Sequence, residues 1–183
     1  MSKLLLGPDE EMWRGRFISV AKRPFTNTET GKEGHWEMVK REARGRIVGV
    51  IAVTPENEAI IIKIFRVPLN KYVLECAAGL PDKAGEPEIE LARRELLEET
   101  GYACRTLTPV VSGPINGGLV ADEMVFFLGL NAQKVAEPTP EDAEDIEVLK
   151  VPVAELPALL KNPPEGVLVD FKIWALLPFL PKN

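Results

Sequence analysis

EIELARRELLEETG, residues 88–101, decides the fold of this chain because it reads as one amphipathic helix. Apolar residues recur along it at helical spacing: Ile89, Leu91, Ala92, Leu96 and Leu97. Pro87 precedes the stretch and Gly101 ends it, and these residue types favour the first turn and the end of a helix. The sequence therefore predicts a helix over roughly residues 87–100.

Three glutamates share one side of this predicted helix. Glu95, Glu98 and Glu99 lie within a sector of about 100°, because three and four positions correspond to about one turn. A charged stripe is most often a solvated face, but like charges at this spacing repel, and Arg94 relieves only part of the repulsion. A divalent cation relieves it better, and carboxylate oxygens select Mg²⁺ or Mn²⁺. With His35 as the single histidine and two cysteines, a zinc site is disfavoured.

The whole chain has the composition of a soluble globular protein. At 183 residues, 45% hydrophobic and 27% charged, it is expected to form a single domain. A net charge of −6 argues against nucleic-acid or anionic-membrane partners bound through a basic surface. No apolar run approaches the roughly 20 residues of a membrane span, and MSKLLLGPDEE has too short an apolar core for a signal peptide. A cytoplasmic protein is expected.

Hydrophobic patterning predicts many strands and very few helices, an α+β fold. The predicted strands cover residues 14–25, 35–43, 46–54, 58–67, 72–76, about 104–112, about 122–130 and 146–152. Two further helical segments are predicted over residues 152–162 and 168–180. In the second, four residues are predicted to pack on the core: Phe171, Trp174, Ala175 and Leu177.

Residues 79–102, GLPDKAGEPEIELARRELLEETGY, closely resemble the signature of the Nudix hydrolases. That signature is Gly, five residues, Glu, seven residues, then Arg-Glu-apolar-x-Glu-Glu-x-Gly-apolar. The matching positions are Glu86, Arg94, Glu95, Leu96, Glu98, Glu99, Gly101 and Tyr102. Six residues rather than five separate Gly79 from Glu86, but the extra residue falls in the loop before the helix and leaves the phase of the carboxylates unchanged.

The ADP-ribose pyrophosphatase branch of this family resembles the chain in five further segments: WRGRF (13–17), HWEMVKR (35–41), FRV (65–67), YVLECAAG (72–79) and PEDAEDIEV (140–148). Two departures are present. Ala77 replaces the usual proline, and Gly113-Pro114 reverses the usual Pro-Gly order in a loop that in the branch lies over the terminal ribose of the substrate.

The resemblance implies a Nudix-type α/β/α sandwich with a mixed β-sheet and an N-terminal extension of antiparallel strands. It implies one Nudix domain over residues 1–183, in which residues 1–45 serve dimerisation and substrate binding and residues 46–183 form the catalytic core. A homodimer with exchanged N-terminal strands is expected.

The resemblance also implies a metal site on the acidic helix. Glu95, Glu98 and Glu99, with the backbone carbonyl of Ala78, would hold Mg²⁺ or Mn²⁺, which neutralises charge on a diphosphate and activates water. Glu98 would thereby be catalytic as well as a ligand. Arg94 is a further catalytic candidate, with the alternative that it is a fixed cation orienting Glu86 or a ligand carboxylate.

A general base and two phosphate-binding arginines are implied next. The base is predicted to be Glu144, with Glu141 and Asp142 as neighbours that could substitute. Arg66, at the end of a predicted strand, would bind a phosphate through its planar fork, with a surface arginine as the alternative. Arg41 is the second phosphate candidate.

The remaining substrate contacts are predicted from Glu75 and from aromatic residues near the N-terminus. Trp36 and Phe17 would stack on adenine, with Trp13 and Phe25 as alternatives. The competing interpretation is that these aromatics are core residues, which is common for aromatics on strands.

The expected activity is hydrolysis of ADP-ribose, or of a related nucleoside diphosphate sugar, to a nucleoside monophosphate and a sugar phosphate. One alternative is another diphosphate substrate such as GDP-mannose. The other is a non-catalytic Nudix-like domain that senses a nucleotide, which the presence of all three ligand glutamates disfavours.

Overall fold

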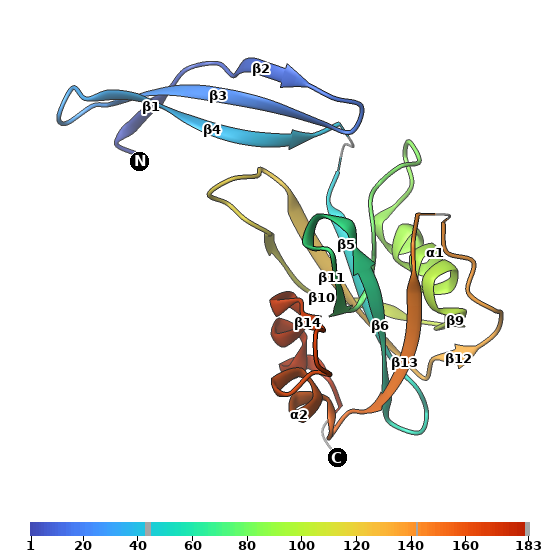
Figure 1. Cartoon of the computed structure of the whole chain (residues 1–183). Helices are drawn as coiled ribbons and strands as arrows, with labels where there is room; N and C mark the ends of the chain where they lie inside the picture. Colours follow the sequence, from blue (N-terminus) through green and yellow to red (C-terminus); the bar gives the residue numbers. More distant parts are fainter. Residues whose placement is uncertain (43–44, 142, 182–183) are drawn as a thin grey trace. The chain divides into compact units, whose positions relative to one another are not determined.

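The computed structural model describes residues 1–42, 45–141 and 143–181. The chain forms two compact units. One comprises Met1–Arg46 with Gly113–Met124, and the other comprises Ile47–Ser112 with Val125–Asn183. Figure 1 shows the elements of both units.

The first unit is built on a four-stranded antiparallel sheet. Its strands are β1 (Leu4–Leu6), β2 (Glu10–Arg14), β3 (Ile18–Asn27) and β4 (Glu33–Arg41). The long β3 pairs with each of the other three strands. The N-terminal antiparallel extension predicted from the sequence is confirmed. The strands β1 and β2 were not predicted, because one is three residues long and the other, EEMWR, lacks an alternating pattern.

This sheet leaves large apolar side chains in solvent. The exposed ones are Leu4, Leu5, Leu6, Met12, Trp13 and Trp36, and Phe17 is exposed between β2 and β3. Within β1 to β4 only Ser19 and Ala21 are buried. The first unit therefore has exposed apolar side chains on its sheet.

The second unit holds most of a mixed eight-stranded sheet. Its strands are β5 (Ile47–Val53), β6 (Glu58–Arg66), β7 (Lys71–Glu75), β8 (Ala77–Gly79), β10 (Leu107–Pro114), β11 (Glu123–Leu130), β13 (Ile146–Pro152) and β14 (Leu168–Val169). The order is β10-β11-β5-β6-β7-β14, with β8 paired to β5 and β13 paired to β6. The pairing of β14 with β7 is parallel, whereas β6 pairs antiparallel with β7 and β13.

Smaller elements complete this unit. β9 (Tyr102–Ala103) and β12 (Gln133–Lys134) form a separate two-stranded sheet. The helices are α1 (Glu88–Thr100) and α2 (Leu156–Lys161), with 3₁₀ segments η1 (Val67–Leu69) and η2 (Phe171–Phe179). No helix in the described ranges is long and apolar enough to cross a membrane.

The core lies on both faces of the central strands. Ile51 and Ile61, in β5 and β6, are fully buried, as are their neighbours Ala52 and Ile60 on the opposite face. Strands buried on both faces read as continuous apolar runs and need cover on each side. Figure 1 shows α1 on one side of this sheet and α2 with η2 on the other. The predicted fold class is confirmed.

The acidic helix has the predicted ends. Pro87 is its N-cap, and Gly101 ends it with φ of 73°, a left-handed conformation that glycine adopts without strain. The prediction for Leu97 is wrong: this side chain is 38% exposed. Leu91, Ala92 and Leu96 fill the buried stripe, which continues through Glu99 and Thr100 rather than Leu97.

The C-terminal helical segment also differs from its prediction. It is a 3₁₀ segment, and its buried residues are Ile173 and Leu176, three positions apart as the 3₁₀ period requires. Phe171 and Trp174, predicted to face the core, are 72% and 40% exposed, and Ala175 is exposed as well. The prediction assumed a period of 3.6 residues, which selected the wrong face.

Candidate active site

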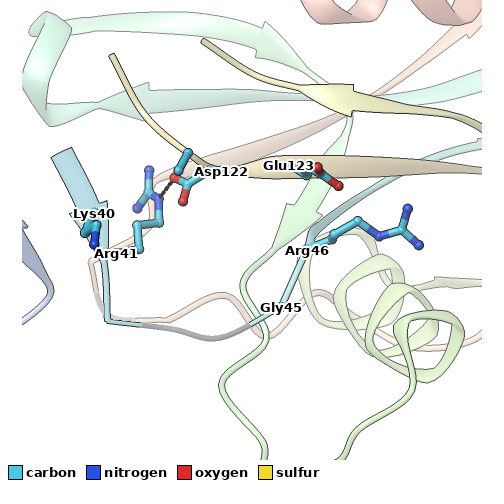
Figure 2. Close-up of a pocket in the computed structure, with 7 residues that line it drawn as sticks. Lys40, Arg41, Gly45, Arg46, Asp122 and Glu123 are labelled. Atoms are coloured by element: carbon cyan, nitrogen blue, oxygen red, sulfur yellow. Dashed lines mark hydrogen bonds and ion pairs between the residues drawn. The ribbon is translucent and has the colours of Figure 1, made fainter. Parts of the chain in front are cut away.

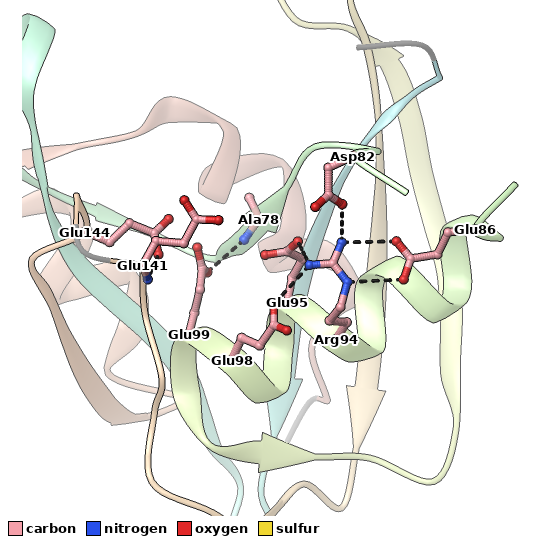
Figure 3. A network of polar contacts seen from close by, with 9 residues as sticks. All are labelled: Ala78, Asp82, Glu86, Arg94, Glu95, Glu98, Glu99, Glu141 and Glu144. Carbon is pink, nitrogen blue, oxygen red and sulfur yellow. Dashed lines mark hydrogen bonds and ion pairs between the residues drawn. The ribbon is translucent and has the colours of Figure 1, made fainter. Parts of the chain in front are cut away.

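Acidic side chains from three separate segments of the second unit converge beside α1. Figure 3 shows Glu95, Glu98 and Glu99 on the helix, with Ala78 of β8 on one side and the loop of Glu141 and Glu144 on another. The helix places its three glutamates there because they share one face. The arrangement concentrates negative charge in a partly buried place.

Glu99 is the most buried of these acids, at 3% exposure. One carboxylate oxygen accepts a hydrogen bond from the backbone N–H of Ala78, at 3.0 Å. Burial raises the pKa of Glu99 to about 8, and the negative charges of Glu144 and Glu95 add to this, against the lowering effect of the Ala78 bond. An ionised Glu99 therefore needs a positive partner.

Glu95 shares this environment. Burial raises its pKa to about 7, and Glu98 adds to the rise while Arg94 opposes it. The end of β8 packs directly on this side chain, since a Cβ atom at Gly79 would lie only 2.1 Å from the carboxylate carbon of Glu95. A larger residue at position 79 would therefore displace the Glu95 carboxylate.

Arg94 joins the carboxylates of the helix to the loop before it. It donates two hydrogen bonds of 3.1 Å to Glu86, one of 3.0 Å to Glu98 and one of 2.6 Å to Asp82. It also forms an ion pair of 2.9 Å with Glu95. Glu86 is the main cause of a pKa for Arg94 above its usual range. This geometry is that of an orienting cation, the alternative weighed for Arg94 from the sequence.

Asp82 was missed by sequence reasoning. It lies within the six residues that separate Gly79 from Glu86, where the motif has one residue more than usual. Its bond to Arg94 ties this longer loop to the helix. The sequence signal was only an acidic residue in a loop, which is common on surfaces.

A second arginine lies at the end of β6. Arg66 donates bonds of 2.8 and 2.7 Å to the two carboxylate oxygens of Glu75, and this pairing is the main cause of its raised pKa. Glu99 and Glu144 are also close enough to act on Arg66 electrostatically. Arg66 therefore presents a fixed guanidinium beside the acidic cluster, and Glu75, predicted as a substrate contact, holds it.

The loop that carries the predicted base is internally bonded. The N–H of Glu141 donates to the Glu144 carboxylate, and the N–H of Glu144 donates to the Glu141 carbonyl, both at 2.9 Å. Asp142, the third candidate, lies outside the described residues. Tyr72, which the sequence did not suggest, donates a bond of 2.5 Å to Asp145 at the end of this loop.

The other predicted substrate residues belong to the first unit. Arg41 donates to Asp122 at 2.6 Å, and Figure 2 shows the two side chains pointing toward each other. The indole N–H of Trp36 donates to the carbonyl of Gly118 at 2.8 Å. Phe17 is exposed, with the guanidinium of Arg16 4.9 Å from its ring centre.

The two alternative aromatics have different surroundings. Trp13 is exposed and lies against Gly15, where a Cβ atom would meet its ring at 2.5 Å. Phe25 is half-buried, and its ring covers Gly34. Phe25 therefore packs within the sheet, whereas Trp13, like Trp36 and Phe17, presents its ring to solvent.

The acidic cluster fits a hard divalent cation by its chemistry. Among the described residues, no three metal-binding side chains are already arranged around a common point. Glu95 and Glu98 are instead held by Arg94, and Glu99 by Ala78. However, the donors are all oxygens, and burial leaves Glu95 and Glu99 with raised pKa values that a cation would lower.

Comparison with known proteins identifies the family to which this chain belongs. The NUDIX domain family model matches residues 43–171, and the chain therefore belongs to the Nudix family. The membership predicted from the signature is confirmed, and the chain is a Nudix hydrolase. Members of this family generally use divalent metal ions, in agreement with the donor set beside α1.

Two curated relatives and one solved structure are similar over most of the chain. An ADP-ribose pyrophosphatase of Bacillus subtilis (strain 168) is 34% identical over 155 residues, covering 84% of this chain and 80% of the relative. A methanol dehydrogenase activator of Bacillus methanolicus is 31% identical over 158 residues, with the same coverage. A crystal structure of an ADP compounds hydrolase has a TM-score of 0.80 at 22% identity, covers 98% of this chain and 92% of that one, and shares the fold.

Proposed function

We propose that this protein hydrolyses the diphosphate bond of ADP-ribose or a related nucleoside diphosphate sugar, releasing a nucleoside monophosphate and a sugar phosphate. The observation that carries this proposal is that an acidic cluster and a fixed arginine lie close together in the second unit. The buried acid Glu99 lies close to Arg66, whose guanidinium Glu75 fixes, and Glu95 is one turn before Glu99 on the same face of α1. A diphosphate needs both a cation held by acids and an arginine fork.

Mg²⁺ or Mn²⁺ is the proposed cofactor. Glu95, Glu98 and Glu99, with the backbone carbonyl of Ala78, would hold it. Such an ion neutralises charge on phosphoryl oxygens and makes water a better nucleophile. Arg94, through Glu86 and the helix acids, keeps the carboxylates in position.

Glu144 is the proposed general base, and Glu141 is the alternative. A base must take a proton from the attacking water, so its carboxylate has to reach that water. The Glu144 carboxylate accepts the Glu141 N–H in this structure and would exchange that bond for the water. Arg66 would bind a phosphate of the substrate through donors of its planar fork.

The first unit is proposed to bind the nucleoside and a phosphate. Trp36 and Phe17 would stack on the adenine, and Arg41 would contact a phosphate. In this arrangement residues 1–45 serve dimerisation and substrate binding, and residues 46–183 serve catalysis, within one Nudix domain. A homodimer with exchanged N-terminal strands is supported by the apolar side chains that the first unit exposes.

The proposed compartment is the cytoplasm. Cys76 and Cys104 are both free and buried. Free cysteines are typical of reducing compartments, where disulfides are rare.

A substrate panel tests the proposed function. Purified protein is incubated with ADP-ribose, GDP-mannose and other nucleoside diphosphate compounds, with Mg²⁺ or with EDTA. Released phosphomonoesters are converted to inorganic phosphate by a phosphatase that does not attack the intact diphosphates. We expect release from ADP-ribose with Mg²⁺ and none in EDTA. Preferred cleavage of GDP-mannose would redirect the substrate, and tight binding without cleavage would identify a nucleotide sensor.

A further inference from the structure

The loop between β10 and β11 has a defined shape. The carbonyl of Asn116 accepts bonds from the N–H groups of Leu119, at 3.0 Å, and Val120, at 2.9 Å. At the base of the loop, the N–H of Ile115 donates to the carbonyl of Asp122 at 3.2 Å. Residues 115–122, here called the bracket loop, therefore form an internally bonded turn.

The bracket loop is attached to β4 along its length. The N–H of Val39 donates to the carbonyl of Leu119 at 2.9 Å, and Val39 forms a parallel β-bridge with Val120. On either side of this bridge, Trp36 bonds to Gly118 and Arg41 bonds to Asp122. Both side chains that β4 is proposed to offer to the substrate are therefore held by the bracket loop.

The contact between Arg41 and Asp122 is a charge-assisted hydrogen bond of 2.6 Å. The Asp122 side chain is 17% exposed and that of Arg41 is 42% exposed, so the acid is the more buried partner. The bond uses Nε of Arg41, one of the five N–H donors of a guanidinium. The neighbouring Lys40 is paired with Asp9 instead.

We propose that Asp122 is a positioning residue, which from the bracket loop fixes the Arg41 guanidinium for an anionic phosphate of the substrate. This inference rests on the proposed function, because it takes Arg41 as a substrate contact. A free arginine side chain loses rotamer freedom when it binds a phosphate, and a side chain already held in place loses less. Asp122 therefore acts on substrate affinity and not on the bond being cut.

Trp36 shows the same arrangement with a neutral partner. Its bond to the Gly118 carbonyl fixes the plane of the indole ring before any base arrives. The two bonds join β4 to residues more than 80 positions later in the chain, with separations of 82 for Trp36 and 81 for Arg41. The bracket loop thus pre-orders one stacking surface and one cation.

Steady-state kinetics with ADP-ribose and Mg²⁺ test the role of Asp122. Asp122→Asn keeps the shape but removes the charge, and should raise KM about fivefold to twentyfold while kcat stays within about twofold. Glu29→Gln is the control, because it removes a carboxylate charge from a different ion pair of the same unit, the exposed pair with Lys3. Both of its constants should match those of the wild type.

A double-mutant cycle separates positioning from a general structural role. If Asp122 acts through Arg41, adding Asp122→Asn to Arg41→Lys should raise KM by less than about twofold over Arg41→Lys alone. Fully additive effects, or a fall in kcat with KM unchanged, overturn the inference. If Asp122→Asn does not fold, Asp122→Glu decides, because it displaces the charge by one methylene: a raised KM supports the inference and an unchanged KM overturns it.

A measurement that does not depend on turnover tests this inference independently of the proposed function. The Nε proton of Arg41, assigned by NMR through Arg41→Lys, should exchange slowly with solvent in the wild type and quickly in Asp122→Asn. Fast exchange in the wild type overturns the positioning role. A wild type that cleaves no diphosphate overturns the proposed function, whereas an active wild type with an Asp122→Asn variant equal to Glu29→Gln overturns this inference alone.

Discussion

Asp9 in the first unit and Glu99 in the second are acids in opposite settings. Asp9 is bonded to both Arg23 and Lys40, and these two cations lower its pKa to about 2. Glu99 is buried against a backbone N–H and other acids, and its pKa is raised to about 8. The surroundings of Asp9 therefore favour its ionised form, whereas those of Glu99 favour its protonated form.

This difference distinguishes an acid that stabilises the fold from an acid that could bind a ligand or a metal ion. An acid whose charge is already matched by cations stabilises the fold and has no charge left for a ligand. A buried acid without a matching cation costs stability, and such a cost persists where a ligand or metal supplies the missing charge. Glu99 is of the second kind, because the nearby Arg66 is already bonded to Glu75.

The largest expected effect comes from removing one helix carboxylate. Glu98→Gln and Glu99→Gln should each lower kcat by at least about a hundredfold, because each removes a charge proposed to hold the ion. Asp9→Asn is the control from the other setting, and should keep kcat while lowering the melting temperature. Kinetics and thermal denaturation of each variant check this. Near-normal turnover in a folded Glu99→Gln variant would contradict the proposed role of Glu99 in holding the metal ion.

Trp36→Ala should have the next largest effect. Stacking on a base is a binding contact remote from the bond being cut. The loss of about 1–3 kcal/mol of binding free energy should therefore raise KM for ADP-ribose, while kcat changes little. Analytical ultracentrifugation of the wild type should show a dimer of the 20.2 kDa chain. A fully active monomer would contradict the exchanged-strand site, and unfolding of Trp36→Ala would make Trp36 a core residue.

The pH dependence of the stability of the folded protein should report the ionisation of the buried Glu99. The folded pKa of Glu99 is raised from 4.5 to about 8, so its proton is lost more easily in the unfolded chain. Without metal, the stability of the wild type should therefore be unaffected by this group below about pH 4.5 and fall as the pH rises toward 8.

Melting temperatures in EDTA measure this effect against Glu99→Gln. The two proteins should melt together at pH 4, and the variant should melt at least about 3 °C higher at pH 8. Mg²⁺ should stabilise the wild type more at pH 8 than at pH 5, and more than it stabilises the variant. A constant difference between the proteins across this pH range would show that Glu99 carries no uncompensated charge.

Tyr72→Phe should have the smallest effect of the four. It removes the bond to Asp145 that holds one end of the loop carrying Glu144. A less well-held base should lower kcat about threefold to tenfold with KM unchanged, and the loss should be similar for all cleaved substrates. Kinetics on two substrates check this, and a change in KM alone would mean that Tyr72 contacts the substrate.

The sequence predicted what depends on local pattern. The acidic helix was found because Pro87 and Gly101 mark its ends, and the shared face of Glu95, Glu98 and Glu99 follows from helical spacing alone. The strand Ile146–Pro152 was predicted with its observed ends, since its β-branched pattern is unambiguous. The Nudix signature then gave the family.

What the sequence did not reveal depends on contacts between distant positions. The bonds of Arg94 to Asp82, of Tyr72 to Asp145 and of Arg41 to Asp122 join residues whose proximity no local pattern specifies. The exposed face of the C-terminal 3₁₀ segment was missed because most of its residues are apolar, so the assumed period of 3.6 residues alone chose the face. Tertiary packing, which determines which of them is buried, overrides periodicity.

The attachment of the bracket loop to β4 has a consequence for synthesis of the protein on the ribosome. The first unit consists of Met1–Arg46 and Gly113–Met124, with β5 to β8 and α1 encoded between them. Its N-terminal strands emerge first, yet the partners of Trp36 and Arg41 emerge only after much of the second unit. The first unit is therefore completed late, and during translation its apolar sheet lacks the bracket loop, a stage at which nascent chains are open to mispairing.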